Sequence, residues 1–238
     1  KVDIIELDTL RRPKLTNYGH MIDYCRNFSH YFISGKAYGV IGECGSGGWT
    51  LSYLLTGRDK VADGEIRINN KIANTEYLKK YGCYVGEGTN PKALFGLKKR
   101  TILEELKMGL KESGRKDYSL EKIIELFGLS EDRLNYPVQK ISWEKWRASM
   151  AIGFAYGKKI FCFPWCSTSW VNDLVLGAGI HICIDVVTKD GAIVILPTSK
   201  TESVDFFVDE IVYLNNPSHE PAPRAKEHVE QYRQSKLK

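Results

Sequence analysis

The stretch GECGSGGWT, residues 42–50, lies between an apolar run and a segment whose apolar residues recur at helical spacing. Glycines in a G-x-x-G-x-G pattern between a strand and a helix are typical of a phosphate-binding loop, in which backbone N–H groups and the helix N-terminus hold the phosphates. Gly48 stands where such a loop has its lysine, and Trp49 stands where a small hydroxyl residue is expected. Taken alone, the stretch is a phosphate site, the remnant of one, or an ordinary glycine turn.

Strands are predicted on both sides of this loop. The segment 1–10 alternates like an edge strand, and 63–73 reads as a hairpin with its turn at Asn69 and Asn70. Further strands are predicted at 31–41, 81–88, 158–165, 192–197 and 210–216. The third and fourth of these have the continuous apolar character of strands that are buried on both faces of a parallel sheet.

Helices are predicted between the strands. The segments are 49–57, 101–114, 119–129, 142–157 and 199–209, with a helix followed by a turn in 173–191. Ser119 and Ser142 are the expected N-caps of two of them, because a serine hydroxyl accepts a hydrogen bond from a backbone N–H of the first turn. Alternating strands and helices with an antiparallel start and a helical insertion predict an α/β core.

The composition is that of an ordinary globular protein. The chain has 238 residues, of which 43% are hydrophobic and 26% charged, enough to build a sizeable core. The net charge of +5 permits an anionic partner but does not require one. No apolar run approaches the roughly 18 residues of a membrane-spanning helix, so no such helix is predicted.

The cysteines are interpreted as reduced, mostly buried thiols, because the chain is too large to need disulfide staples. The spacing of Cys162, Cys166, His181 and Cys183 raises zinc binding as the alternative. Cys162 and Cys183 fall in runs that read as strands, which argues against a ligand loop. No metal site is therefore predicted.

The order of these segments resembles the nucleotide-binding domain of ATP-binding cassette (ABC) transporters along about residues 3–216. The stretch 81–106 is similar to the segment that carries the Q-loop of that family, with Glu87 at the glutamine position. The stretch 138–165 resembles the signature motif, its helix and the Walker B strand, and 192–200 resembles the strand of the switch histidine.

The resemblance places a degenerate nucleotide site on Tyr18, at the position of the adenine-stacking aromatic residue, and on the glycine loop. The loop residues of this site are Gly42, Gly45, Ser46, Gly47, Gly48, Trp49 and Thr50. Because an indole at the first helical turn lies beside the expected phosphates, an empty or indole-plugged site is predicted. No cofactor is expected, and binding of ATP with magnesium is the alternative.

Other catalytic positions of the family are altered as well. In the signature motif Ser142 is kept, but Trp143 and Glu144 replace the glycines and Lys145 replaces the glutamine. After the Walker B strand, Pro164 and Trp165 replace the aspartate and the catalytic glutamate. Thr198 replaces the switch histidine. Phosphoryl transfer depends on these groups to position the reactants and neutralise charge. No catalytic residue is therefore assigned, and the chain is expected to be a pseudo-ATPase rather than an enzyme.

The resemblance implies the α/β P-loop NTPase fold of the ABC ATPase type, with a mainly parallel sheet core, an antiparallel edge sheet and a helical subdomain. Residues 1–87 and 156–216 would form the ATPase-like core, 88–155 the helical subdomain, and 217–238 a polar C-terminal tail.

The expected function is that of a non-hydrolysing structural or regulatory subunit of a membrane transporter-like complex. Its partners would be integral membrane subunits and a second cassette subunit, and it would lie in the cytoplasm at the inner face of the membrane. Trp49 and Trp143 are candidate interface anchors, because large aromatic residues often anchor interfaces.

Two alternatives stay open. One is an ATP-binding subunit that hydrolyses ATP weakly or only with an intact partner cassette. The other is a soluble binding module with basic patches at 11–14 and 98–100. Salt-sensitive nucleic-acid binding would favour the second alternative, but nucleic acid is not the favoured partner.

Overall fold

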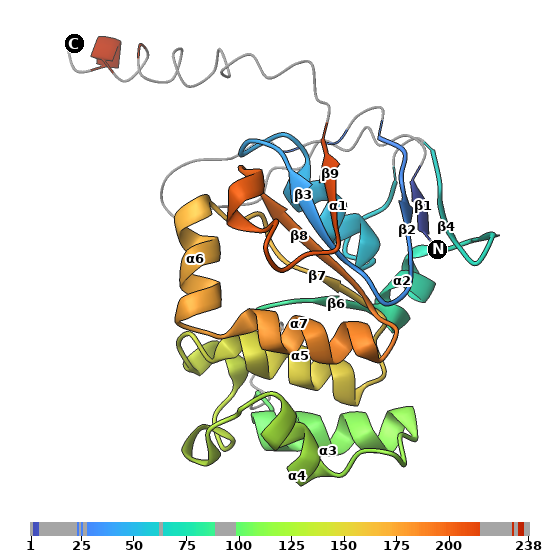
Figure 1. The fold of residues 1–238 in the computed structure, drawn as a ribbon, viewed down its shortest axis with the longest axis vertical. Helices are drawn as coiled ribbons and strands as arrows, with labels where there is room; N and C mark the ends of the chain where they lie inside the picture. Colours follow the sequence, from blue (N-terminus) through green and yellow to red (C-terminus); the bar gives the residue numbers. More distant parts are fainter. Residues whose placement is uncertain are drawn as a thin grey trace.

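The structure is a computed structural model that describes residues 2–4, 23, 25, 28–61, 64–88, 99–214, 230 and 233–235. Two β-sheets and the helices that cover them are stacked in layers (Figure 1). The glycine-rich stretch 42–47 lies at the C-terminal end of the parallel sheet, directly after one of its central strands.

A five-stranded parallel sheet forms the centre of the molecule, in the strand order β6-β7-β8-β3-β9. Its strands are β3 (Ala37–Ile41), β6 (Gly82–Tyr84), β7 (Ile160–Cys162), β8 (Ile193–Thr198) and β9 (Glu210–Tyr213). All residues of β3, β7 and β8 are buried. This confirms the prediction of central strands that are covered on both faces.

A second, antiparallel sheet has the order β2-β1-β4-β5. Its strands are β1 (Val2–Ile4), β2 (Tyr31–Phe32), β4 (Ile66–Ile68) and β5 (Lys71–Ile72). The predicted hairpin turn is confirmed, because Asn69 and Asn70 adopt the positive φ angles of 52° and 65° that such a tight turn needs. The prediction of an edge strand near the N-terminus is wrong, since β1 pairs with both β2 and β4. Alternation of apolar and polar residues indicates that one face of a strand is buried, but it does not distinguish an edge strand from a central strand.

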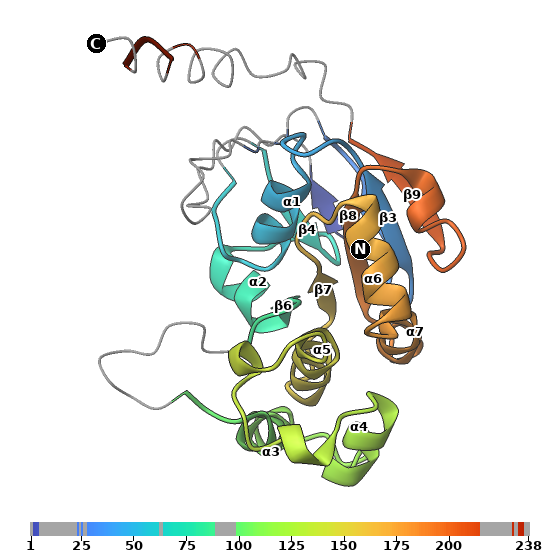
Figure 2. The same cartoon turned by 90° about the vertical axis from the view of Figure 1, so that its left-hand side faces the viewer.

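Helix α1 (Gly48–Leu55) covers one face of the parallel sheet (Figure 2). Leu51, Leu54 and Leu55 are fully buried in a core that also contains Ile160 and Ile195. The other face is covered by α5 (Lys145–Ala155), α6 (Thr168–Leu176) and α7 (Ile180–Lys189).

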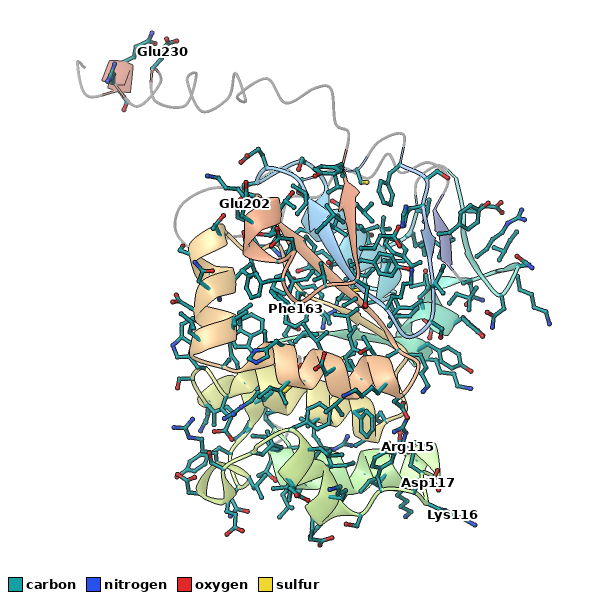
Figure 3. The ribbon with its side chains drawn as sticks, viewed as in Figure 1. Arg115, Lys116, Asp117, Phe163, Glu202 and Glu230 are labelled. Atoms are coloured by element: carbon teal, nitrogen blue, oxygen red, sulfur yellow. The ribbon has the colours of Figure 1, made fainter. Side chains whose placement is uncertain are left out.

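Beyond α5 lies an outer helical layer made of α3 (Ile102–Ser113) and α4 (Leu120–Leu126), seen at the bottom of Figure 1. Thr101 and Glu104 form a capping box at the start of α3, and the predicted Ser119 cap of α4 is confirmed, since its hydroxyl accepts from Lys122 N–H. Arg115, labelled in Figure 3, follows α3 and forms an ion pair with Asp190 at the end of α7.

Three predictions about helices need correction. Helix α5 begins at Lys145 with Glu144 as its N-cap, because the preceding residues form a turn in which Lys145 N–H donates to the carbonyl of Ser142. The segment 173–191 contains parts of two helices, broken where Gly179 takes a left-handed φ of 59°. The segment 199–209 holds only a short 3-10 turn, Thr201–Ser203.

Helix α2 (Thr75–Tyr81) was not predicted from the sequence. Its signal was Asn74, whose side chain accepts a hydrogen bond from Tyr77 N–H as an N-cap. Across the part of the chain that the structure describes, no single helix is long and apolar enough to cross a membrane; α6 and α7 pass that test of length and composition only as a pair bent by 80°.

Candidate functional site

The glycine loop joins β3 to α1, as the phosphate-loop pattern predicted. Gly45 and Gly47 have φ angles of 93° and 106°, which residues other than glycine rarely adopt. The start of the loop is fixed to the neighbouring strand, because Gly42 N–H donates to the carbonyl oxygen of Thr198 over 2.9 Å. Two of the pattern's glycines therefore stand where the backbone requires glycine.

A carboxylate from elsewhere in the chain binds the backbone N–H groups at the start of α1. Asp23, which is 1% exposed, accepts hydrogen bonds from the N–H of Gly47 over 2.9 Å and the N–H of Thr50 over 2.7 Å. The hydroxyl oxygen of Thr50 lies 2.7 Å from the carbonyl oxygen of Asp23 and 2.9 Å from its carboxylate. An aspartate that the sequence analysis did not single out thus occupies the end of the helix where anions bind.

Gly48, at the lysine position, is enclosed by two side chains. A Cβ atom added to Gly48 would lie 2.8 Å from Cβ of Pro197 and 3.0 Å from Cδ1 of Trp165. In the resemblance, Pro197 stands before the position of the switch histidine, and Trp165 stands at the position of the catalytic glutamate. A side chain at position 48 would therefore need both neighbours to move.

Trp165 also crosses to the start of the loop, where its indole N–H donates to the carbonyl oxygen of Gly42 over 2.8 Å. The residue follows β7, and the neighbouring Phe163 lies fully buried in the interior (Figure 3). The hydroxyl of Ser52 in α1 donates to the carbonyl of Phe163 over 2.6 Å, which holds α1 against the end of β7.

Trp49 is half-buried and points toward the end of β6. Its indole N–H donates to the hydroxyl of Tyr84 over 3.1 Å, and its ring lies 6.3 Å from that of Trp165. Tyr84 stacks on Tyr53 of α1 with an interplanar angle of 3°. The prediction that Trp49 fills the space of the phosphates and magnesium stays a prediction. Trp165 and Pro197 also lie close to Gly48.

Glu87, at the Q-loop glutamine position, forms an ion pair with Arg58 over 2.9 Å. The guanidinium of Arg58 also lies 4.3 Å from the ring centroid of Tyr84, within the range of a cation–π contact. The hydroxyl of Ser149 in α5 donates to the carbonyl of Glu87 over 2.7 Å. Glu87 is therefore fixed by contacts to the α1 side and to α5.

In the segment that resembles the signature motif, Glu144 turns inward. It is 4% exposed, and its carboxylate accepts from the N–H and hydroxyl of Ser130, each over 2.7 Å, and from Arg133 over 3.0 Å. Ser142 and Trp143 are exposed, Trp143 at 42%. A charged side chain satisfied inside the protein thus stands where the resemblance expects a glycine.

The cysteine constellation is spread over several elements. Cys162 lies in β7 and Cys183 in helix α7, so the prediction that Cys183 lies in a strand is wrong. Burial raises the pKa of Cys166 and Cys183 to about 12, which keeps both thiols protonated. Among the residues that the structure describes, no group of three or more His, Cys, Asp or Glu side chains could hold a metal ion.

Several predicted residues lie outside the described residues. These are Tyr18, the basic residues Arg11, Arg12, Lys14 and Lys98, and most of the tail 217–238. The structure brings the predicted loop residues together with Trp165 and adds Asp23, whereas Glu87 contacts Arg58 and Ser149. The sequence signal for Asp23 was a single acidic residue near the apolar Met21, Ile22 and Cys25, which is too common a pattern to identify a site.

No family model matches the chain. Among curated proteins it is similar to the methionine import ATP-binding protein MetN of Streptococcus agalactiae, with 24% identity over 204 residues that cover 82% of this chain and 57% of MetN. It is also similar to the energy-coupling factor transporter ATP-binding protein EcfA1 of Thermotoga maritima, with 27% identity over 186 residues covering 78% and 70%. The chain spans less than two thirds of the length of the MetN relatives.

Solved structures show the same fold. CbiO1 of Clostridium perfringens, part of the ABC transporter complex cbiONQ, matches with a TM-score of 0.60 and 15% identity, covering 90% of this chain and 84% of CbiO1. A dimeric ATP-binding cassette bound to ADP and Pi matches with a TM-score of 0.62 and 21% identity, covering 90% and 94%.

The fold is therefore the P-loop fold of the ABC ATPases, as the sequence predicted. The curated relatives are named as import or transporter ATP-binding proteins, and the solved neighbours as ATP-binding cassettes, so the chain has the fold of an ABC-type nucleotide-binding domain.

Proposed function

We propose that this chain is a catalytically degenerate ABC-type nucleotide-binding domain, which acts as a non-hydrolysing structural or regulatory subunit of a membrane transporter-like complex. The observation that carries the proposal is the enclosure of Gly48, where an added Cβ meets Pro197 at 2.8 Å and Trp165 at 3.0 Å. The resemblance places a phosphate-binding lysine at this position, and the chain has neither that side chain nor room for it.

The ends of the neighbouring strands support the same conclusion. Pro164 and Trp165 follow β7 at the positions where the family has its two acidic residues, and Thr198 ends β8 at the histidine position. Removing one electrostatic group from an active site commonly lowers the rate about 10²- to 10³-fold. Because the lysine, both carboxylates and the histidine are all replaced, little catalytic machinery is left.

The expected partners are integral membrane subunits and a second cassette, at the cytoplasmic side of the membrane. The relatives are named as an import ATP-binding protein and a transporter ATP-binding protein, and CbiO1 is described as part of a transporter complex. A second candidate function is an ATP-binding subunit that works weakly or only with an intact partner. It is favoured by the retained Thr50 and by the left-handed glycines Gly45 and Gly47.

An ATPase assay on the purified chain, with and without the membrane proteins that co-purify with it, tests the proposal. We expect phosphate release no faster than in buffer and no rise in melting temperature with millimolar Mg-ATP. A ligand at 100 times its Kd stabilises a protein by about 2.7 kcal/mol, which melting curves detect easily. Magnesium-dependent turnover that is lost when Thr50 is changed to valine would instead support the second candidate.

A further inference from the structure

The anion-binding end of the glycine loop is already occupied by a side chain of the same protein. Both oxygens of the Asp23 carboxylate accept backbone hydrogen bonds, one from Gly47 and one from Thr50. We propose that Asp23 is an internal anion that takes the place of a phosphate group and keeps the loop closed to phosphate ligands. This inference rests on the proposed function of a cassette that does not hydrolyse ATP. It identifies the side chain that keeps phosphate out of the nucleotide site.

The chemistry of the two N–H groups explains why a carboxylate binds there. The N-terminus of an α-helix carries a partial positive charge of about half an elementary charge, and its first N–H groups lack partners within the helix. The N-cap residue Gly47 has no side chain that could accept a hydrogen bond from them. Asp23 supplies the missing acceptor from outside the helix.

The segment that carries Asp23 is anchored by apolar packing. Cys25 and Phe28 are 1% and 6% exposed and belong to the same buried cluster as Leu51 and Leu54 of α1. The carboxylate is therefore held at the loop by its neighbours in sequence as well as by its own hydrogen bonds. A buried carboxylate is costly unless its hydrogen bonds are satisfied, so Asp23 and the loop stabilise each other.

The experiment replaces Asp23 and offers the protein an external oxyanion. Melting temperatures of the wild type and of Asp23→Ala are measured in sodium phosphate and in sodium chloride of equal ionic strength. We expect Asp23→Ala to melt below the wild type in chloride and to gain at least about 3 °C in phosphate, because phosphate occupies the vacated N–H groups. The wild type should show no phosphate-specific gain, since Asp23 excludes the ion.

Asp209→Ala is the matched control. The Asp209 carboxylate also accepts a backbone hydrogen bond, from Ala37 N–H over 2.7 Å, but that N–H belongs to a strand rather than to a helix N-terminus. This variant should lose stability without recovering any in phosphate. Equal gains in phosphate for all three proteins, or no gain for Asp23→Ala, would overturn the inference.

Asp23→Asn provides a second measurement in case the alanine variant does not fold. Amide hydrogen exchange at Gly47 and Thr50 should be faster in Asp23→Asn than in the wild type, and phosphate should slow it only in the variant. Identical exchange with and without phosphate would contradict the inference. ATP turnover by the wild type tests the proposed function separately, because it is measured without any change at Asp23.

Discussion

The indole N–H of Trp165 donates a 2.8 Å hydrogen bond to the carbonyl oxygen of Gly42, so the segment that follows β7 is attached directly to the start of the glycine loop. The same ring lies 3.0 Å from the position of a Cβ at Gly48. Trp165 thus both contacts the start of the loop and lies against Gly48. The resemblance assigns the positions of Trp165 and Gly48 to a catalytic glutamate and a phosphate-binding lysine.

Replacing Trp165 by phenylalanine should destabilise the protein by about 1 kcal/mol or more, because the carbonyl of Gly42 loses its donor and the smaller ring leaves a gap. Urea unfolding measures the change in the free energy of unfolding. Trp170→Phe is the control, since Trp170 is 41% exposed on α6 and packs at the protein surface. Equal losses in the two variants would show that the contact of Trp165 with Gly42 contributes nothing specific.

Introducing the missing lysine by Gly48→Lys should destabilise the protein by roughly 1–3 kcal/mol and should not create ATP binding, because an added Cβ overlaps Pro197 and Trp165. Gly48→Lys combined with Trp49→Ser should behave in the same way, since this second change leaves both Pro197 and Trp165 in place. Titration calorimetry with Mg-ATP checks both variants.

Adding Trp165→Ala to Gly48→Lys removes one of the two obstructing side chains and should recover part of the lost stability. A double-mutant cycle over positions 48 and 165 measures this recovery. If the changes in the free energy of unfolding are strictly additive, or if Gly48→Lys alone binds ATP, then the lysine side chain does not contact Trp165.

The sequence predicted the fold well because its signals were local and repeated. Apolar runs located β7 and β8, and the glycine pattern located the loop before α1. The site was predicted less completely, because its decisive contacts join residues far apart in the chain. Asp23 meets Thr50 across 27 positions and Trp165 meets Gly42 across 123. Local periodicity carries no information about such contacts.

Glu144 illustrates the same limit. In the resemblance its position is a glycine of the signature motif, whereas in the structure a carboxylate stands there and is buried against Ser130 and Arg133. Changing Glu144 to glutamine should cost about 1–3 kcal/mol, because the amide cannot accept all of these hydrogen bonds and Arg133 loses its charged partner. Glu131→Gln, at an exposed position nearby, should have almost no effect on chemical unfolding. Similar losses in the two variants would contradict this.

The last prediction concerns the contact between the outer helical layer and α7. Burial alone would raise the pKa of Asp190, but hydrogen bonds from Lys159 and Arg115 and the charges of both lower it below the ordinary 3.8. A carboxylate with a lowered pKa in the folded state stabilises the protein above its unfolded pKa, and this stabilisation is lost as the pH falls through the folded value.

The wild type should therefore be more stable than Asp190→Asn near neutral pH, and the difference should shrink as the pH falls below 3.8. Urea unfolding of both proteins over that range measures the difference. Asp185→Asn, at an exposed position of α7, controls for the loss of one surface carboxylate. A difference between wild type and Asp190→Asn that stays constant with pH would show that Arg115 and Lys159 stabilise the contact without depending on the charge of Asp190.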